Sequence, residues 1–174
     1  GKTENLSFVE AVKKLASYAG ISVEDKVYKK EDIIIQKRIK NLKDILTIAN
    51  NWFHNNLKRE LKTNKFLQEI FKKRNFNENI INTFLLGYAP KRNDTLYSYL
   101  KSKDFFSKDI SDAGLIIISS KNNEIFDRFN NRIIFPIYDY SSNVVGFGGK
   151  ALSQNQIGKY VNSPSTDLFK KGDL

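Results

Sequence analysis

Residues 132–150 read RIIFPIYDYSSNVVGFGGK, and this stretch decides which kind of fold the chain can form. Arg132–Tyr138 and Val144–Phe147 are short runs of β-branched and aromatic residues, which is typical of strands. Between them, Asp139–Asn143 supplies the small polar residues of a hairpin turn. Pro136 has no backbone N–H to donate, so it predicts a sheet edge or a bulge at that point. The stretch therefore predicts part of an antiparallel sheet.

Upstream of this stretch, apolar residues recur every three or four positions, which predicts amphipathic helices. In the first, over residues 7–19, Ser7 and Glu10 form a capping box and Gly20 ends the helix. The longest covers the apolar positions from Ile35 to Phe53. Four short helices are predicted at 65–73, 78–85, 95–102 and Lys108–Ala113. The N-caps of the first three are Asn64, Asn77 and Asp94. A further strand is predicted at Leu115–Ile118. The predicted fold class is α+β, with N-terminal helices followed by a small, mainly antiparallel sheet.

Size and composition limit the class of protein. With 174 residues, 40% of them hydrophobic, the chain can bury a core and should form one compact domain or two small lobes. No apolar run approaches the roughly 20 residues that span a bilayer, and the first residues lack the apolar core of a signal peptide. We therefore expect a cytoplasmic protein without a membrane partner. The chain has no Cys and one His, which excludes a thiolate zinc centre within it.

The charge of the chain is strongly positive, with a formal net charge of +10 and a pI near 9.6. Between Lys26 and Arg74 there are fourteen basic and five acidic residues, so most of the excess lies in the helical half. Such a charge suits a polyanion, because phosphates attract Lys and Arg and release counterions on binding. The same composition would also arise from an AT-rich genome whatever the function, and charge alone does not decide between the two interpretations.

Several catalytic motifs are missing. No phosphate-binding loop is present, and Gly146, Gly148 and Gly149 do not match a dinucleotide-binding pattern; they favour a tight turn or bulge after a strand. His54 falls on the longest predicted helix and is interpreted as a structural or surface residue. Two-metal phosphoryl transfer needs clustered carboxylates, and no Asp-x-Asp occurs here. We therefore do not expect this chain alone to catalyse nucleotidyl transfer.

Cationic and polar residues follow the predicted strands. Side chains alternate across a strand, so Arg132 points away from Ile133, while Lys150 closes the glycine turn. Together they form a candidate phosphate-binding edge. Further candidates in the same region are Lys159, Asn162, Lys170 and Lys171. The alternative for this second group, an ordinary polar hairpin and a charged C-terminal end, is equally compatible with the pattern.

Three phrases near the C-terminus carry a resemblance to a known family. They are FDRFNNRIIFPIYD at 126–139, VVGFGGK at 144–150 and KYVNSPSTDLFKKG at 159–172. Weaker agreement extends through FKKRNFNENIINTFLLGYAP at 71–90 and LSFVEAVKKLASYAGI at 6–21. In order and spacing the chain resembles the DnaG family of bacterial DNA primases over nearly its whole length.

The resemblance implies a place within a longer primase. The family has an N-terminal zinc-binding domain, an RNA-polymerase core with a basic subdomain and a Toprim catalytic subdomain, and a helicase-binding domain. Residues 1–22 would then contain the helix that follows the zinc-binding domain, and residues 23–174 would be the basic N-terminal subdomain of the core, ending before Toprim. The resemblance implies no cofactor in this fragment; it places zinc in the N-terminal domain and magnesium in Toprim.

The resemblance also implies function and contacts. The full protein would synthesise short RNA primers on single-stranded DNA at the replication fork, associated with the nucleoid. Its partners would be the template, the RNA primer, ribonucleoside triphosphates and, through a C-terminal domain, the replicative helicase. The basic positions of the family motifs fall on Arg74, Arg128, Arg132, Lys150, Lys159 and Lys171, with Asn162 and Lys170 beside them.

The chain departs from the family pattern at several positions. Phe126 replaces a usual Tyr, Asn130 and Lys150 each replace a usual Arg, and Ser165 replaces a usual Glu, while the region 91–94 lacks a Trp. Lys150 keeps the charge of Arg without its bidentate fork. Two other functions stay open: a non-enzymatic module that binds single-stranded nucleic acid, and a partner-binding domain whose charge reflects genome composition.

Overall fold

The computed structural model describes residues 14–20, 30–91, 95–153, 156–170 and 172. The chain divides into two compact units, Gly1–Ile35 and Gln36–Leu174. In the first unit, residues 14–18 are helical and Gly20 has a left-handed φ of 67°, in agreement with the predicted end of a helix. The capping box of Ser7 and Glu10 and the predicted boundary after residue 22 lie outside the described residues, so both stay predictions.

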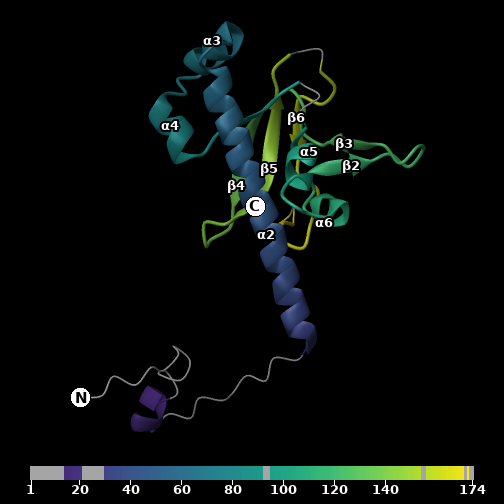
Figure 1. The fold of residues 1–174 in the computed structure, drawn as a ribbon. Helices are drawn as coiled ribbons and strands as arrows, with labels where there is room; N and C mark the ends of the chain where they lie inside the picture. Colours follow the sequence, from purple (N-terminus) through teal and green to yellow (C-terminus); the bar gives the residue numbers. More distant parts are fainter. Residues whose placement is uncertain (1–13, 21–29, 92–94, 154–155, 171, 173–174) are drawn as a thin grey trace. The chain divides into compact units, whose positions relative to one another are not determined.

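The longest helix is α2, Lys30–Glu60 (Figure 1). It extends beyond the predicted apolar pattern at both ends. Acidic residues stand in its first turn and Lys58 and Arg59 in its last, which complements the helix dipole. From Leu42 to Leu57 the helix buries one apolar stripe, formed by Leu42, Ile45, Leu46, Ala49, Phe53 and Leu57. His54 contacts the carbonyl oxygen of Leu86 through Nδ1 at 2.9 Å, as suits a structural residue.

The main sheet has four antiparallel strands in the order β1-β4-β5-β6. They are β1 Gly87–Ala89, β4 Arg132–Tyr138, β5 Val144–Ala151 and β6 Tyr160–Asn162. The predicted β4–β5 hairpin is confirmed, and Asp139 accepts from the backbone N–H of Asn143 in its turn. A separate ribbon pairs β2, Ile116–Ile118, with β3, Ile125–Asp127. Helices followed by antiparallel sheet confirm the predicted α+β class.

Pro136 is accommodated because β1 is short. This strand pairs only with Arg132–Ile134, so the β1 side of β4 is a local edge at Pro136. The β4–β5 register also shifts between Ile137 and Tyr138. The prediction of an edge or bulge is therefore confirmed at this position, although β4 lies inside the sheet.

The sheet has two distinct faces. On one, Ile134 and Phe147 pack against α2, and the rings of Phe53 and Phe147 lie 5.4 Å apart; we call this the α2 face (Figure 1). Helix and sheet approach closely at Gly87, where an added Cβ would lie only 2.5 Å from the Cβ of Phe53. Side chains alternate along a strand, so Phe135, Lys150 and their neighbours belong to the opposite face.

Two short helices border the opposite face: α3, Lys65–Lys73, and α4, Glu78–Thr83. The side chains of Asn64 and Asn77 accept from the backbone at their N-termini, which confirms both predicted caps. Between the helices, Phe76 packs on Phe71 and on Phe135 of β4, with ring centroids 5.6 and 6.3 Å apart. This second apolar cluster attaches α3 and α4 to the sheet.

Two further helices, α5 Leu96–Lys101 and α6 Ser107–Asp112, lie near the β2–β3 ribbon (Figure 1). The N-cap of α5 is Thr95, which corrects the prediction of Asp94. The Asp127 carboxylate of β3 also accepts from the N–H groups of Leu96 and Tyr97, at 2.7 and 3.0 Å. Burial raises the pKa of Asp127, while these two bonds oppose the rise.

The glycine phrase is part of a strand, which corrects the prediction of a turn. Strand β5 continues through Gly148 and Gly149 to Ala151 because it pairs with β4 on one side and with β6 on the other. Gly149 leaves space for its neighbours: a Cβ there would lie 2.7 Å from Phe129. Cross-strand pairing thus outweighs the low strand propensity of glycine.

Within the described ranges, no helix combines the length and apolar character needed to cross a membrane.

Candidate nucleic-acid interface

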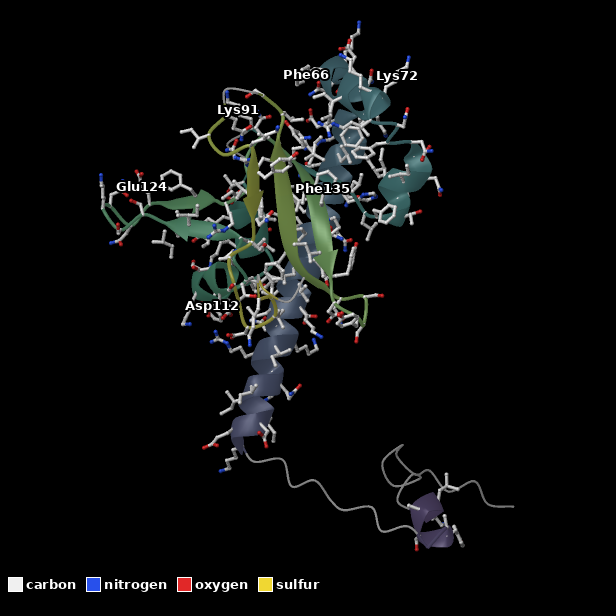
Figure 2. The ribbon with its side chains drawn as sticks, turned by 180° about the vertical axis from the view of Figure 1, so that it is seen from behind. Phe66, Lys72, Lys91, Asp112, Glu124 and Phe135 are labelled. Carbon is white, nitrogen blue, oxygen red and sulfur yellow. The ribbon has the colours of Figure 1, made fainter. Side chains whose placement is uncertain are left out.

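A cationic hollow of ≈ 590 Å³ lies at one end of the opposite face. Its basic residues come from three segments: Lys73 and Arg74 from the end of α3, Lys150 from β5, and Lys159 from the loop before β6. Ile70, Ile133 and Leu152 contribute apolar wall. None of the described residues that line it carries a carboxylate. Figure 2 views the sheet from this side, with Phe135 on the strands and α3, which carries the labelled Lys72, next to them.

Local structure brings these cations together. Helix α3 ends at Arg74, and Asn75 takes the left-handed conformation with φ 54°, which turns the chain so that Phe76 can pack on the sheet. The β4–β5 pairing places Lys150 opposite Ile133, and the β5–β6 pairing places it opposite Tyr160. Lys159 immediately precedes Tyr160. The hollow therefore depends on one helix end and two strand pairings.

Tyr160 lies among these cations. Tyr160 is 60% exposed, and the ammonium groups of Lys150 and Lys159 lie 5.4 and 5.9 Å from the centroid of its ring. A hydrogen bond from Lys150, together with the positive charges of Lys150, Lys159 and Arg74, lowers the pKa of the Tyr160 phenol. The phenol thus reports a positive potential that would also favour a bound phosphate.

Arg132 differs from a free surface cation. Its side chain is buried, and its guanidinium donates to the carbonyl oxygens of Gly158 and Ile157 at 2.7 and 2.8 Å. Burial lowers its pKa from the usual value for arginine. Arg132 therefore holds the turn directly before Lys159. The sequence predicted that Arg132 contacts phosphate directly. We propose instead that it positions Lys159 by holding this turn.

Asn162 does not line the hollow but lies on the same face of the sheet. It is exposed on β6 and pairs with Gly148, whose added Cβ would lie 3.4 Å from the Asn162 Oδ1. The amide is therefore on the same face as Lys150 and Tyr160. Because Gly148 has no side chain, this part of the face offers a polar amide beside open backbone.

The other predicted contacts lie elsewhere or are not described. Arg128 is partly buried and donates through Nε to the carbonyl oxygen of Gly114 at 2.9 Å, and burial lowers its pKa. Lys170 lines a different hollow, with Ile137 and Tyr140. Lys171 lies outside the described residues. The structure therefore brings Arg74, Lys150 and Lys159 into one hollow, with Asn162 on the same face, and leaves Arg128 and Lys170 outside it.

Sequence reasoning did not select Lys73 and Tyr160. Lys73 is one of several basic residues at the end of α3, and its type alone did not separate it from the solvated lysines around it. Tyr160 belongs to the quoted KYVNSP phrase, but its contact with Lys150 depends on the β5–β6 register. That pairing could have been found only by recognising the three-residue strand β6.

The described residues offer no cluster of metal ligands. Within the described segments, no three His, Asp or Glu side chains gather at one place, and the sequence contains no Cys. The hollow and the face around it offer electrostatic and hydrogen-bonding groups instead: fixed cations, an exposed aromatic ring and an amide. Such a set suits the phosphate and base groups of a nucleic-acid strand.

A family model for the DNA primase catalytic core, N-terminal domain, matches residues 52–174, and the chain belongs to this family. The DNA primase of Clostridium acetobutylicum is 40% identical over 174 residues, which cover 98% of this chain and 27% of that protein. The chain thus spans about a quarter of the length of this curated relative.

Two solved structures are also similar. One is described as the DnaG primase catalytic domain bound to ssDNA; it has 31% identity and a TM-score of 0.66 over 79% of this chain and 41% of that chain. The other is the Aquifex aeolicus primase with its zinc-binding and RNA polymerase domains, with 26% identity and a TM-score of 0.64 over 97% of this chain and 38% of that chain. They confirm the predicted family and fold.

Proposed function

We propose that this chain is the nucleic-acid-holding part of a DNA primase, an RNA polymerase that makes short RNA primers on single-stranded DNA. One observation carries the assignment to the chain itself: Arg74, Lys150 and Lys159 come from separate segments and line one hollow whose described lining carries no carboxylate. The names of the relatives and the similarity to a primase domain bound to ssDNA support it.

The hollow holds a strand mainly by electrostatics. Lys150 and Lys159 attract backbone phosphates, and Arg74 adds a planar fork of donors from the other side. The exposed ring of Tyr160 offers a stacking surface to a base, and Asn162 offers a hydrogen bond further along the face. Arg132 contributes indirectly by holding the turn before Lys159. These groups bind without reading a base sequence.

The remaining contacts belong to the same proposal. Arg128, Lys170 and Lys171 are proposed to contact the RNA–DNA hybrid or nucleotides in the complete primase. Magnesium for nucleotide transfer, zinc and contact with the replicative helicase are assigned to other parts of the parent polypeptide. The zinc-binding domain named for the Aquifex aeolicus structure supports the zinc assignment.

Binding to a labelled single strand over a salt series tests this function. We expect Arg74→Ala, Lys150→Ala and Lys159→Ala each to weaken binding and to reduce the slope of log K against log salt by about 0.7, because each removes one phosphate contact. Lys121→Ala, in the β2–β3 turn, is the matched control and should bind as the wild type does. Unchanged slopes in all three variants would contradict the proposal.

Primer synthesis by the intact parent protein tests the enzymatic part. Lys159→Ala should lower primer yield at limiting template, whereas Lys121→Ala should not. The alternative of a non-enzymatic binding module predicts a parent protein that binds single strands without making primers. The relatives, which are named DNA primases, favour the enzymatic function.

A further inference from the structure

A second hollow, of ≈ 370 Å³, lies between α2 and the start of α5. Trp52, Asn56 and Arg59 line it from α2, and Ser98 and Tyr99 line it from α5. Trp52 packs against the core cluster of the α2 face, whereas Lys150 lies on the opposite face. This α2–α5 hollow is therefore separate from the cationic hollow, and the proposed primase function does not use it.

Two aromatic rings form part of its wall. The centroids of Trp52 and Tyr99 lie 6.2 Å apart with the planes tilted by 31°, so the rings contact each other, and both side chains are only partly buried. The ammonium group of Lys103 lies 5.6 Å from the centroid of Tyr99, which adds positive charge nearby. Exposed parts of such rings attract planar aromatic ligands.

Two polar groups of the hollow are the Asn56 amide, which has an unpaired donor, and the Arg59 guanidinium, which is bonded to that amide. Asn56 is 4% exposed, and its Oδ1 accepts from Arg59 Nη2 at 2.5 Å. This bond orients the guanidinium, whose other N–H groups can serve a ligand. The Asn56 Nδ2 is buried and has no acceptor among the described residues. An unpaired buried donor costs free energy that a ligand acceptor would recover after a small adjustment of the side chain.

We propose that the α2–α5 hollow binds a nucleobase that carries a phosphate. The base lies over the rings of Trp52 and Tyr99, an acceptor on its edge meets the Asn56 amide, and Arg59 holds the phosphate. None of the described lining residues is a carboxylate, so no lining side chain repels the anion. A free nucleotide and an unpaired base of a strand share this chemistry, and the experiment separates them.

The fluorescence of Trp52 is a direct probe, because it is the single tryptophan of the chain. In the full chain, we expect AMP to quench this fluorescence in a saturable manner and ribose 5-phosphate, which has no base, to leave it unchanged. If a free nucleotide is the ligand, AMP suffices. If an unpaired base of a strand is the ligand, an oligodeoxyadenylate quenches and AMP does not. Absence of saturable quenching with both probes would overturn the proposal.

Matched variants separate binding from folding. Arg59→Ala should raise the midpoint concentration of the effective probe at least tenfold, and Lys58→Ala, the adjacent cation outside this hollow, should change it less than twofold. Circular dichroism and the thermal midpoint check that Arg59→Ala remains folded, and Arg59→Lys should recover part of the affinity. An Arg59→Ala protein that is folded and titrates like the wild type would overturn the site.

The two proposed sites can fail independently. The double variant Lys150→Ala/Lys159→Ala should weaken binding of a labelled single strand but retain the full quenching of Trp52 at saturating concentrations of the effective probe. Should quenching disappear in that variant, the signal would originate at the cationic hollow and the α2–α5 site would be rejected. Loss of Arg59-dependent quenching alone would leave the primase proposal intact.

Discussion

Tyr160 allows the cationic hollow to be tested one residue at a time. Its pKa is lowered first by the hydrogen bond from Lys150 and then by the charges of Lys150, Lys159 and Arg74. Lys150→Ala should therefore raise this pKa toward the ordinary value of 10.0, because the tyrosinate loses its strongest stabilising partner. A pH titration of ¹³C-labelled tyrosine by NMR measures the shift.

Lys159→Ala should raise the pKa of Tyr160 by less than Lys150→Ala does, because Lys159 acts by charge alone. Lys121→Ala serves as a control, since Lys121 lies in the turn of the β2–β3 ribbon. If Lys150→Ala left the pKa unchanged, the contact between Lys150 and Tyr160 would not persist in solution.

At this scale the sequence predicted which residue types matter, but not which of them face a ligand. Arg74, Lys150 and Lys159 stand at basic positions of the family motifs, and they line one hollow. Arg132 stands at such a position too, yet its guanidinium donates to the carbonyl oxygens of Ile157 and Gly158. Burial and carbonyl partners depend on how a distant turn folds back, which the local sequence does not encode.

At the scale of elements, the contact between β1 and α2 depends on a glycine. A Cβ on Gly87 would lie 2.5 Å from the Cβ and 3.0 Å from the backbone of Phe53, so Gly87→Ala must displace the strand or the helix. We expect a loss of about 1–3 kcal/mol in the free energy of unfolding, as for other overpacked cores. Urea denaturation measures it.

Gly148→Ala is the matched control, because its Cβ would meet the Asn162 Oδ1 at 3.4 Å, an ordinary contact. Its loss of stability should be clearly smaller than that of Gly87→Ala. Equal stabilities for the two variants would mean that β1 and α2 are less closely packed than the 2.5 Å distance implies.

The β4–β5 turn should make stability depend on pH. Hydrogen bonds from the Asn143 side chain and then from its backbone lower the pKa of Asp139 below its ordinary value of 3.8. Because the pKa is lowered in the folded state, the ionised Asp139 stabilises the fold at pH values above the ordinary pKa. This stabilisation is lost as the pH falls through the ordinary pKa to the lowered pKa of the folded state. Asn143→Ala should raise the pKa of Asp139 toward 3.8.

An NMR titration of the Asp139 carboxyl carbon measures this change, and unfolding at pH 7 and pH 3 should show a smaller pH dependence in Asn143→Ala. Lys43→Ala is the comparison variant, because Lys43 is the weakest of the causes that lower this pKa. A larger shift in Lys43→Ala than in Asn143→Ala would refute the stated order of causes.

Elements with strong local patterns were predicted well from the sequence. The caps Asn64 and Asn77 and the strand Arg132–Tyr138 were found at their observed positions. The strands β1, β3 and β6 were missed, since each has three residues and is formed by pairing with a partner strand. The continuation of β5 through its glycines was missed for the same reason.

At the scale of the whole molecule, the resemblance of three phrases predicted the family, which the family model confirms over residues 52–174. The arrangement of the site needed the structure, because the end of α3 and the strands β5 and β6 are far apart in sequence. The opposite face of the sheet thus carries the proposed path of the strand, and α2 supports that sheet from its other side.

Photocrosslinking locates the bound strand on this surface most directly. A single strand that carries 5-iododeoxyuridine should crosslink mainly to Tyr160, with the yield reduced in Lys150→Ala/Lys159→Ala, when the products are mapped by mass spectrometry. Phe126 of the β2–β3 ribbon is 52% exposed and provides an internal comparison of similar accessibility. Crosslinks that favour Phe126 over Tyr160, or a Tyr160 yield that does not depend on the two lysines, would contradict the assignment of the cationic hollow.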